Sequence, residues 1–241
     1  MQPPDEFFTL YRGLAREGPG LPDDVIWALQ VAGTADGADI CDAGCGSGAD
    51  AVTLAKARPR ARISALDIAP SLVVEARVRL APFGARARVA QGDMAHLPGR
   101  YDLIWCAGAA YFLGLATALR GWRPALKTGG RVAISHPVHT TMPPSDAARA
   151  FWQGEPCQVS DIAGIEAEIA AAGFATLGHR LLIGAPWAAY YGPLAARIEA
   201  LRAAQPSPAL AGVLDASARE IALWRAAPDQ IAYALVVVEP R

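Results

Sequence analysis

The chain has 241 residues, of which 53% are apolar and 19% charged, so it has the composition of a single globular domain with some elaboration. The 22 basic and 23 acidic residues nearly balance, and no segment has the basic density that nucleic-acid binding requires. The longest apolar stretches are about half a membrane span, the N-terminus lacks a signal-peptide pattern, and the four cysteines lack metal-ligand spacing. We therefore expect a cytoplasmic protein that binds no nucleic acid, membrane or metal.

The first 37 residues are expected to form two helices joined by a turn. The first helix is predicted from apolar residues at helical spacing, which are Phe7, Phe8, Leu10, Tyr11 and Leu14. Glycines and a proline in residues 17–20 end this helix, and Pro22 suits the first position of the next one. We expect both helices to cap one edge of the main domain.

From residue 40 onward, short apolar strands alternate with helical stretches. The predicted strands lie at residues 40–44, at 63–67, within 87–93, at 101–106 and at 131–135. The predicted helices lie at residues 49–58, 70–82 and 115–127. Because the strands are nearly unbroken apolar runs, this alternation predicts a parallel sheet covered by helices on both faces.

The second half of the chain has a looser pattern. Isoleucines at helical spacing predict a helix that ends at Gly173, followed by a strand at residues 175–183 and a closing strand at 231–239. Between these two strands, residues 184–228 contain two further predicted helices. Long insertions in compact domains are usually caps or interfaces, so we expect this one to cover an edge of the sheet.

A glycine-rich loop follows the first strand, in the segment Asp42-Ala43-Gly44-Cys45-Gly46-Ser47-Gly48. Glycines let the backbone approach a ligand closely, and the start of the next helix favours an anionic group. With Ala49 in last place the loop also fits the dinucleotide pattern G-x-G-x-x-G/A. Asp67 lies at the end of the second strand, where it could hold ribose hydroxyls of either a dinucleotide or another nucleoside.

Two acidic residues favour a different ligand from a dinucleotide. Asp42 stands two residues before the first glycine, where its carboxylate would repel a pyrophosphate and suit the ammonium group of S-adenosylmethionine. Asp93 directly follows the third strand, where it could accept a hydrogen bond from an adenine amino group. These positions favour S-adenosylmethionine.

At these residues the chain resembles the class I S-adenosylmethionine-dependent methyltransferases. The segments that carry the resemblance are ICDAGCGSG, ISALDI, QGDM, YDLIWCAGAAYFLG and LKTGGRVAISHP. The family implies a Rossmann-like sheet of seven strands, mostly parallel, with the last strand antiparallel beside the fifth. It divides the chain into an N-terminal helical cap segment (1–37) and a methyltransferase domain (38–241) with 184–228 as a helical cap insertion.

The segments FFTLYRGLAREGPG, WCAGAAYFLGL and PWAAYYGPLAARI further resemble a subgroup of small bacterial methyltransferases whose substrate is unsettled. That subgroup usually has Ser-Glu where this chain has Cys106 and Ala107. The difference removes a carboxylate from the loop that would face the methyl donor, and so the subgroup's substrate chemistry does not carry over directly.

The resemblance implies that S-adenosylmethionine, the methyl donor, is bound at the carboxyl ends of the strands. Gly44, Cys45 and Gly46 are implied to contact the methionine portion, and Asp42 its ammonium group. Asp67 is implied to bind the ribose, and Ile68, Asp93 and the Met94 backbone to contact adenine. The backbone of Cys106 and Ala107 is implied to lie near the methionine, and Tyr11 and Arg16 are implied contacts from the N-terminal segment. Arg16 would suit the methionine carboxylate by its charge.

Candidate catalytic residues follow the fourth and fifth strands. His136 and His139 come after the predicted fifth strand, where a histidine could take a proton from an attacking hydroxyl or amine. Tyr111 could orient the acceptor. Either histidine could instead serve only as a locally hydrogen-bonded loop residue.

Aromatic residues are the candidates for a substrate wall, which would favour a sulfonium and exclude water. They are Trp152, Trp187, Tyr190 and Tyr191. For Trp187 and Tyr190, packing of the cap is the stronger single-residue interpretation.

The sequence therefore predicts methyl transfer from S-adenosylmethionine to a neutral or mostly apolar small molecule, by a monomer or a homodimer. Two alternatives stay open. An NAD(P)-dependent oxidoreductase would share the glycine spacing, and a non-catalytic S-adenosylmethionine-binding protein would fit the missing acid at Ala107.

Overall fold

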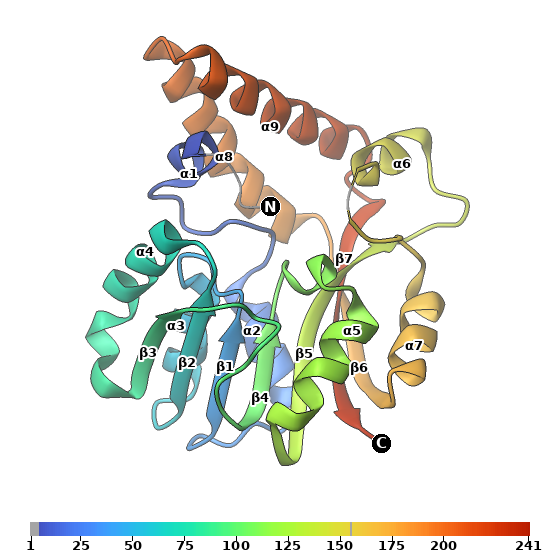
Figure 1. The fold of residues 1–241 in the computed structure, drawn as a ribbon. Helices are drawn as coiled ribbons and strands as arrows, with labels where there is room; N and C mark the ends of the chain where they lie inside the picture. Colours follow the sequence, from blue (N-terminus) through green and yellow to red (C-terminus); the bar gives the residue numbers. More distant parts are fainter. Residues whose placement is uncertain (1–4, 155) are drawn as a thin grey trace.

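Seven strands form one sheet in the order β3-β2-β1-β4-β5-β7-β6 (Figure 1). The computed structural model describes residues 5–154 and 156–241. The strands are β1 (Asp39–Ala43), β2 (Arg62–Asp67), β3 (Ala87–Gln91), β4 (Tyr101–Cys106), β5 (Leu126–His139), β6 (Phe174–Leu182) and β7 (Ile231–Pro240). Neighbours from β3 to β5 are parallel, and β7 is antiparallel to both β5 and β6. The predicted fold class is confirmed.

Helices cover both faces of the sheet because alternate strand residues point to opposite sides. Ile40 and Leu103 enter one core together with residues of α2 (Pro22–Val31), α3 (Ala49–Ala57) and α4 (Pro70–Leu80). Cys41 and Ile104 enter the other core, which is covered by α5 (Leu115–Trp122) and α7 (Ile162–Ala171). Single 3-10 turns connect some elements, at η1 (Ala81–Arg86), η2 (Ala110–Phe112) and η3 (Arg123–Ala125).

The fifth strand is longer than the sequence predicts. It begins at Leu126, inside the stretch expected to be helical, and continues to His139 instead of ending at Ser135. The extension exists because β7 pairs with it along its whole second half, up to the pair His139↔Ile231. Both candidate histidines therefore lie within the strand.

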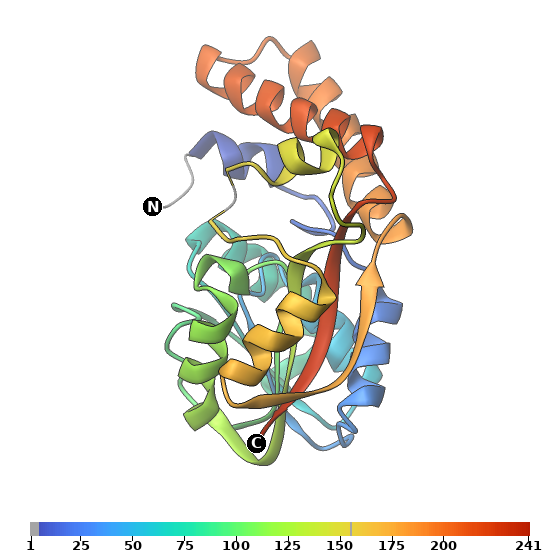
Figure 2. The same ribbon diagram turned by 90° about the vertical axis from the view of Figure 1, so that its right-hand side faces the viewer.

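Four helices form a cap above the carboxyl ends of the strands (Figures 1 and 2). They are α1 (Asp5–Tyr11), α6 (Asp146–Trp152), α8 (Ala185–Ala203) and α9 (Pro208–Ala226), with α1 packed on α8 and α9, and α6 packed on α9. In contrast to the expectation for residues 1–37, α2 packs against α3, β6 and β7 on the face of the sheet.

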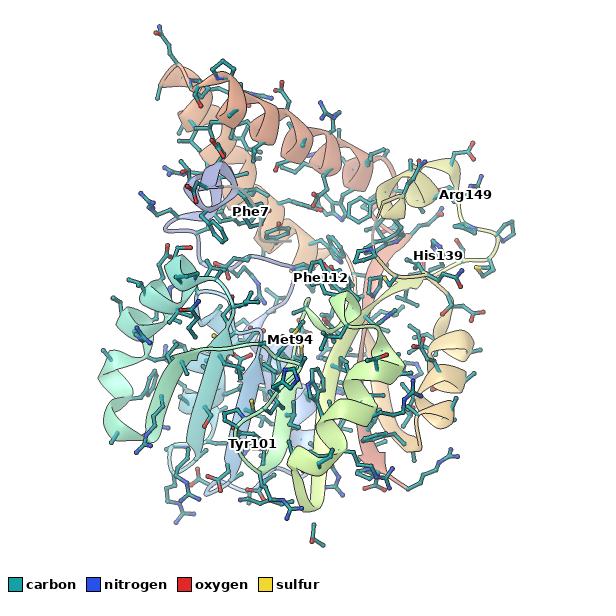
Figure 3. The ribbon with its side chains drawn as sticks, viewed as in Figure 1. Phe7, Met94, Tyr101, Phe112, His139 and Arg149 are labelled. Carbon is teal, nitrogen blue, oxygen red and sulfur yellow. The ribbon has the colours of Figure 1, made fainter. Side chains whose placement is uncertain are left out.

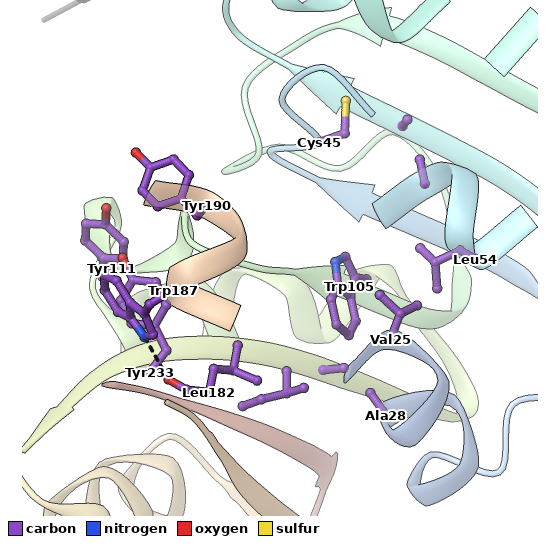
Figure 4. Close-up of a cluster of buried hydrophobic side chains, with 14 of the residues drawn as sticks. Val25, Ala28, Cys45, Leu54, Trp105, Tyr111, Leu182, Trp187, Tyr190 and Tyr233 are labelled. Atoms are coloured by element: carbon purple, nitrogen blue, oxygen red, sulfur yellow. Dashed lines mark hydrogen bonds between the residues drawn. The ribbon is translucent and has the colours of Figure 1, made fainter. Parts of the chain in front are cut away.

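Aromatic rings join the cap to the sheet (Figure 4). The Trp187 ring of α8 lies 5.2 Å from the Tyr233 ring of β7, and the Trp152 ring of α6 lies 5.8 Å from that same tyrosine. Such contacts add about 0.5–1.5 kcal/mol per pair beyond the burial of apolar surface. In the part of the chain that the structure describes, the helices are too short or too polar to cross a membrane.

Candidate active site

The glycine loop between β1 and α3 has a backbone conformation that requires glycine. Gly44, Gly46 and Gly48 have φ angles of 77°, 53° and 89°, which side-chain-bearing residues rarely adopt. A Cβ atom at Gly44 would lie 2.8 Å from the Cβ of Ala109. The loop is held to β2 because the N–H groups of Gly44 and Cys45 both donate to the carbonyl of Leu66, at 2.9 Å.

Two aspartates lie against this loop from the strand ends. The Asp67 carboxylate accepts hydrogen bonds from the N–H groups of Gly46 and Ala69, both at 2.9 Å. Asp42 is 2% exposed, and its Oδ2 has no hydrogen-bond partner among the described residues. Burial, and then the nearby carboxylates of Asp50 and Asp67, raise the pKa of Asp42 well above its usual range. A cation bound here would stabilise the charged form.

The segment before α2 adds a third carboxylate that the sequence analysis treated only as part of a turn. Glu17 Oε2 accepts a hydrogen bond from the N–H of Ser47 at 3.0 Å and lies where a Cβ of Gly46 would be. Its Oε1 is buried and, within residues 5–154 and 156–241, has no partner. Burial raises the pKa of Glu17. No local pattern could have revealed this contact, because Glu17 and Ser47 come from separate elements.

Arg16, predicted to contact the methionine carboxylate, is bound to protein groups in the structure. Its guanidinium contacts Asp50 at 3.2 Å and the carbonyls of Gly18 and Gly20. Asp50, which the sequence analysis also missed, accepts a second hydrogen bond from Nε1 of Trp105 at 3.2 Å. The arrangement fixes the segment before α2 against the first turn of α3.

The residues predicted to bind adenine lie at the ends of the next two strands. Ile68 is 53% exposed, which leaves a surface for a ring to pack on. Asp93 is half exposed, and its carboxylate accepts from the N–H of Ala95 at 2.8 Å. The Met94 side chain lies next to Gly44, while its carbonyl accepts a hydrogen bond from Nε1 of Trp122 at 2.7 Å.

Cys106 and Tyr11 are buried, so they could act only through backbone or through neighbours. The Cys106 thiol is fully buried, and burial raises its pKa well above the usual range. Ala107, half-buried, follows it in the loop. The Tyr11 hydroxyl lies 2.7 Å from the hydroxyl of Tyr190 in α8, and its side chain is therefore part of the cap.

The two candidate histidines lie on opposite faces of the sheet, because they are three positions apart along β5 and successive side chains alternate between the faces. His136 is 3% exposed, and its Nδ1 lies 2.9 Å from the carbonyl of Pro137. Burial lowers the pKa of His136. His139 lies on the cap side, near Trp152. The two imidazoles therefore cannot serve one acceptor together, and the position of His136 favours a packing role.

The aromatic residues predicted as a substrate wall are buried in the cap. Trp187 donates from Nε1 to the carbonyl of Leu182 at 2.8 Å, and Tyr191 donates to Glu220 at 2.6 Å. Tyr190 and Trp152 are also almost completely buried. These contacts favour packing over substrate contact for Trp187 and Tyr191, and Figure 4 shows the hydrogen bond of Trp187 to Leu182. Tyr111, also buried, lies with its ring 6.3 Å from that of Tyr233.

Comparison with known proteins gives a family match over the part of the chain that contains the glycine loop. Residues 40–130 match the family described as methyltransferase domain. The chain is 34% identical over 99 residues to malonyl-[acyl-carrier protein] O-methyltransferase of Dechloromonas aromatica, covering 40% of this chain and 35% of that protein. It is 31% identical over 104 residues to trans-aconitate 2-methyltransferase of Deinococcus radiodurans, covering 42% and 39%. The chain thus spans less than two fifths of these curated relatives.

Solved structures resemble the whole chain. A methyltransferase from Geobacter sulfurreducens, crystallised with S-adenosyl-L-homocysteine, has a TM-score of 0.87 over 99% of both chains at 18% identity. At that identity the likeness shows the fold. The whole chain therefore has the fold of that methyltransferase, and residues 40–130 match the methyltransferase domain family.

Proposed function

We propose that the protein transfers a methyl group from S-adenosylmethionine to a small molecule. The observation that carries the proposal is the set of buried carboxylates at the glycine loop, where Asp42 and Glu17 each have one oxygen without a partner among the described residues. Buried charges are normally paired, and a ligand ammonium would pair with these two. A dinucleotide pyrophosphate would meet the same negative charge and be repelled.

The loop residues would bind the donor by backbone and side chain. Gly44, Cys45 and Gly46 would contact the methionine portion. Asp67 keeps accepting sites beyond its two backbone contacts, since a carboxylate has about four, and these would take ribose hydroxyls. The exposed Ile68 would pack on adenine and Asp93 would accept from its amino group. When bound, S-adenosylmethionine supplies a methyl group made electrophilic by the sulfonium.

On the acceptor side, the protein's task is alignment and exclusion of water. Tyr111, in η2 after β4, would orient the acceptor. The aromatic contacts between cap and sheet hold the cap in place and keep this side dry. Of the two predicted histidines, only His139 lies on the cap side of the sheet. His136 would contribute through packing.

Several further features of the chain support a small-molecule enzyme. The four cysteines are free thiols, which fits the reducing cytoplasm. The near-zero net charge argues against a nucleic-acid partner. Within the described residues, no group of three or more His, Cys, Asp or Glu side chains could hold a metal ion. We propose a cytoplasmic enzyme that acts as a monomer or homodimer.

The non-catalytic alternative keeps one supporting feature, the absence of an acid at Ala107. Transfer from S-adenosylmethionine with a tritiated methyl group to a fractionated metabolite extract distinguishes the alternatives. Label should enter a small molecule with the parent protein and not with Asp67→Ala. Binding of S-adenosylmethionine without transfer to any fraction would instead support a binding protein, and the proposed activity would be wrong.

A further inference from the structure

A second group of polar side chains lies at the end of β5, away from the glycine loop. An open pocket of about 570 Å³ lies between this strand end, α6 and the residues Gln153, Cys157 and Val159. Its polar lining residues are His139, Asp146, Arg149, Trp152, Gln153 and Cys157. Figure 3 labels His139 and Arg149 and shows them beside α6, at the side of the molecule.

Two of the lining residues have a buried side-chain nitrogen atom without a hydrogen-bond partner among the described residues. These atoms are Nδ1 of His139 and Nε1 of Trp152. The Trp152 residue is 7% exposed, and an indole N–H acts only as a donor. An unpaired buried donor destabilises a protein appreciably. An oxygen atom of a bound molecule would satisfy the Trp152 donor.

Arg149 adds positive charge at the mouth of the pocket. Its guanidinium pairs with Asp146, which is 97% exposed. Because exposed ion pairs contribute little, and the guanidinium has five N–H donors in a planar fork, Arg149 can also bind a carboxylate. Burial, followed by the charge of Arg149, lowers the pKa of His139. The imidazole is therefore neutral near pH 7 and offers Nδ1 as donor or acceptor.

The rim of the pocket is fixed by hydrogen bonds to neighbouring segments. The N–H of His139 donates to the carbonyl of Ser160 at 2.9 Å. The N–H of Ser145, which caps α6, donates to Oε1 of Gln230 at 3.0 Å. The lining groups are thus held in position without a ligand, which lowers the entropy lost on binding.

Aromatic rings connect the pocket with the side of the sheet where the donor is proposed to bind. The Trp152 ring lies 5.8 Å from the ring of Tyr233, which lies 6.3 Å from the ring of Tyr111. Tyr111 is in η2, two residues after Ala109, whose Cβ lies against Gly44. Two ring contacts therefore connect the pocket with Tyr111, which is two residues after the residue that borders the glycine loop.

We propose that this pocket binds the carboxylate of the methyl acceptor, whose apolar body points from the pocket toward the donor. The inference rests on the proposed function and specifies its substrate class as an apolar molecule with one carboxylate. Trp152 Nε1 and the Arg149 guanidinium donate to the carboxylate oxygens. His139 Nδ1 completes the site.

The Trp152 indole N–H gives a direct readout of this site. In the full-length chain labelled with 15N-tryptophan and saturated with S-adenosylhomocysteine, Trp152→Phe identifies the Trp152 signal. Acetate, hexanoate and 4-phenylbutyrate are then titrated, each beside its primary amide. We expect the Trp152 signal to move downfield with 4-phenylbutyrate, and the affinity to fall about ten-fold or more for the amide and for Arg149→Met, since bonds to charged groups are the stronger ones.

Trp224→Phe is the matched control. Nε1 of Trp224 is likewise buried without a partner in the described part of the chain, but this residue lies in α9 and outside the pocket lining. Its loss should leave 4-phenylbutyrate affinity unchanged. The proposal is overturned if no carboxylate moves the Trp152 signal, or if each amide binds as well as its acid. Binding of S-adenosylhomocysteine is measured on the same samples to separate failure of the pocket assignment from failure of the proposed function. If this binding is intact, only the pocket assignment fails. If it is absent, the proposed function fails as well.

Discussion

The glycine-loop edge and the cap use opposite means to position chemical groups. At the loop, backbone N–H groups meet the carboxylates of Glu17, Asp42 and Asp67 near the carboxyl ends of β1 and β2, and two carboxylate oxygens stay without protein partners in the described residues. In the cap, the hydroxyls of Tyr11, Tyr190 and Tyr191 and the indole N–H of Trp187 all bond to protein groups. The loop therefore keeps unpaired polar atoms that a ligand could bind, whereas these polar groups of the cap stabilise the packing of the cap.

This difference leads to different expectations for substitutions. Changes in the cap should alter the free energy of unfolding more than ligand affinity, whereas changes at the loop should do the reverse. Each prediction below tests one side of that contrast.

The largest stability effect is expected in the cap. Trp187→Ala should lower the free energy of unfolding by about 3–5 kcal/mol, since it removes a fully buried indole and leaves a cavity. Affinity for S-adenosylhomocysteine, measured where the variant is folded, should change less than about two-fold. Denaturant unfolding and calorimetry measure the two quantities. Trp27→Ala, on a half-buried tryptophan of α2, should cost clearly less stability. A large affinity loss with Trp187→Ala would place this residue in the binding site.

At the loop, Gly44→Ala should reduce affinity for S-adenosylhomocysteine at least about ten-fold while lowering stability by about 1–3 kcal/mol. The added Cβ would meet Ala109 at 2.8 Å, at a φ of 77°. Gly212→Ala in α9 is the control, because a Cβ there meets nothing within 4 Å. That control should slightly stabilise the helix and leave binding intact. Equal affinities of the two variants would contradict the role of the loop.

Asp42→Asn tests the buried charge through its pH dependence. Because burial raises the pKa of Asp42 in the folded state, the unfolded state releases its proton first and the parent loses stability as pH rises above about 4. The variant lacks this loss, so its stability relative to the parent should increase by about 1 kcal/mol between pH 5 and pH 8, while its ligand affinity falls. Asp36→Asn, at an exposed carboxylate paired with Arg60, should show no relative gain. A constant difference across this pH range would refute the argument.

The smallest effect concerns His136. Burial lowers its pKa in the folded state, so the unfolded state binds more protons and stability falls as pH decreases below about 6.5. His136→Asn should flatten this part of the stability curve by up to about 1 kcal/mol, measured by thermal unfolding from pH 5 to pH 8. Its methyl-transfer activity at pH 7.5 should stay close to that of the parent. A large loss of activity with unchanged stability would show that His136 is a catalytic residue after all.

The sequence was most informative where function depends on local backbone geometry. The glycine loop, Asp67 and Asp93 follow strand ends, and alternation of strands and helices is enough to bring those ends to one edge of the sheet. The sheet order itself came from family resemblance. The extension of β5 to His139 was not predictable locally, because pairing with β7, some 90 residues later, forms it.

Side chains supplied by distant segments were the least predictable. Glu17 contacts Ser47 across 30 residues, and the short helix α6, which carries Trp152, has no sustained apolar stripe. Aromatic residues near a cleft are equally compatible with packing and with substrate contact until their partners are known. The bond from Trp187 to Leu182 decides between these roles.

Calorimetric titration with S-adenosylhomocysteine tests the central claim most directly, with NADH and the variant Asp67→Ala measured in parallel. The structure predicts micromolar binding of S-adenosylhomocysteine, a loss of about ten-fold or more in Asp67→Ala because charged hydrogen bonds to the ribose are removed, and no binding of NADH. Binding of NADH without binding of S-adenosylhomocysteine would contradict the assignment of the carboxylate-lined loop and favour the oxidoreductase alternative.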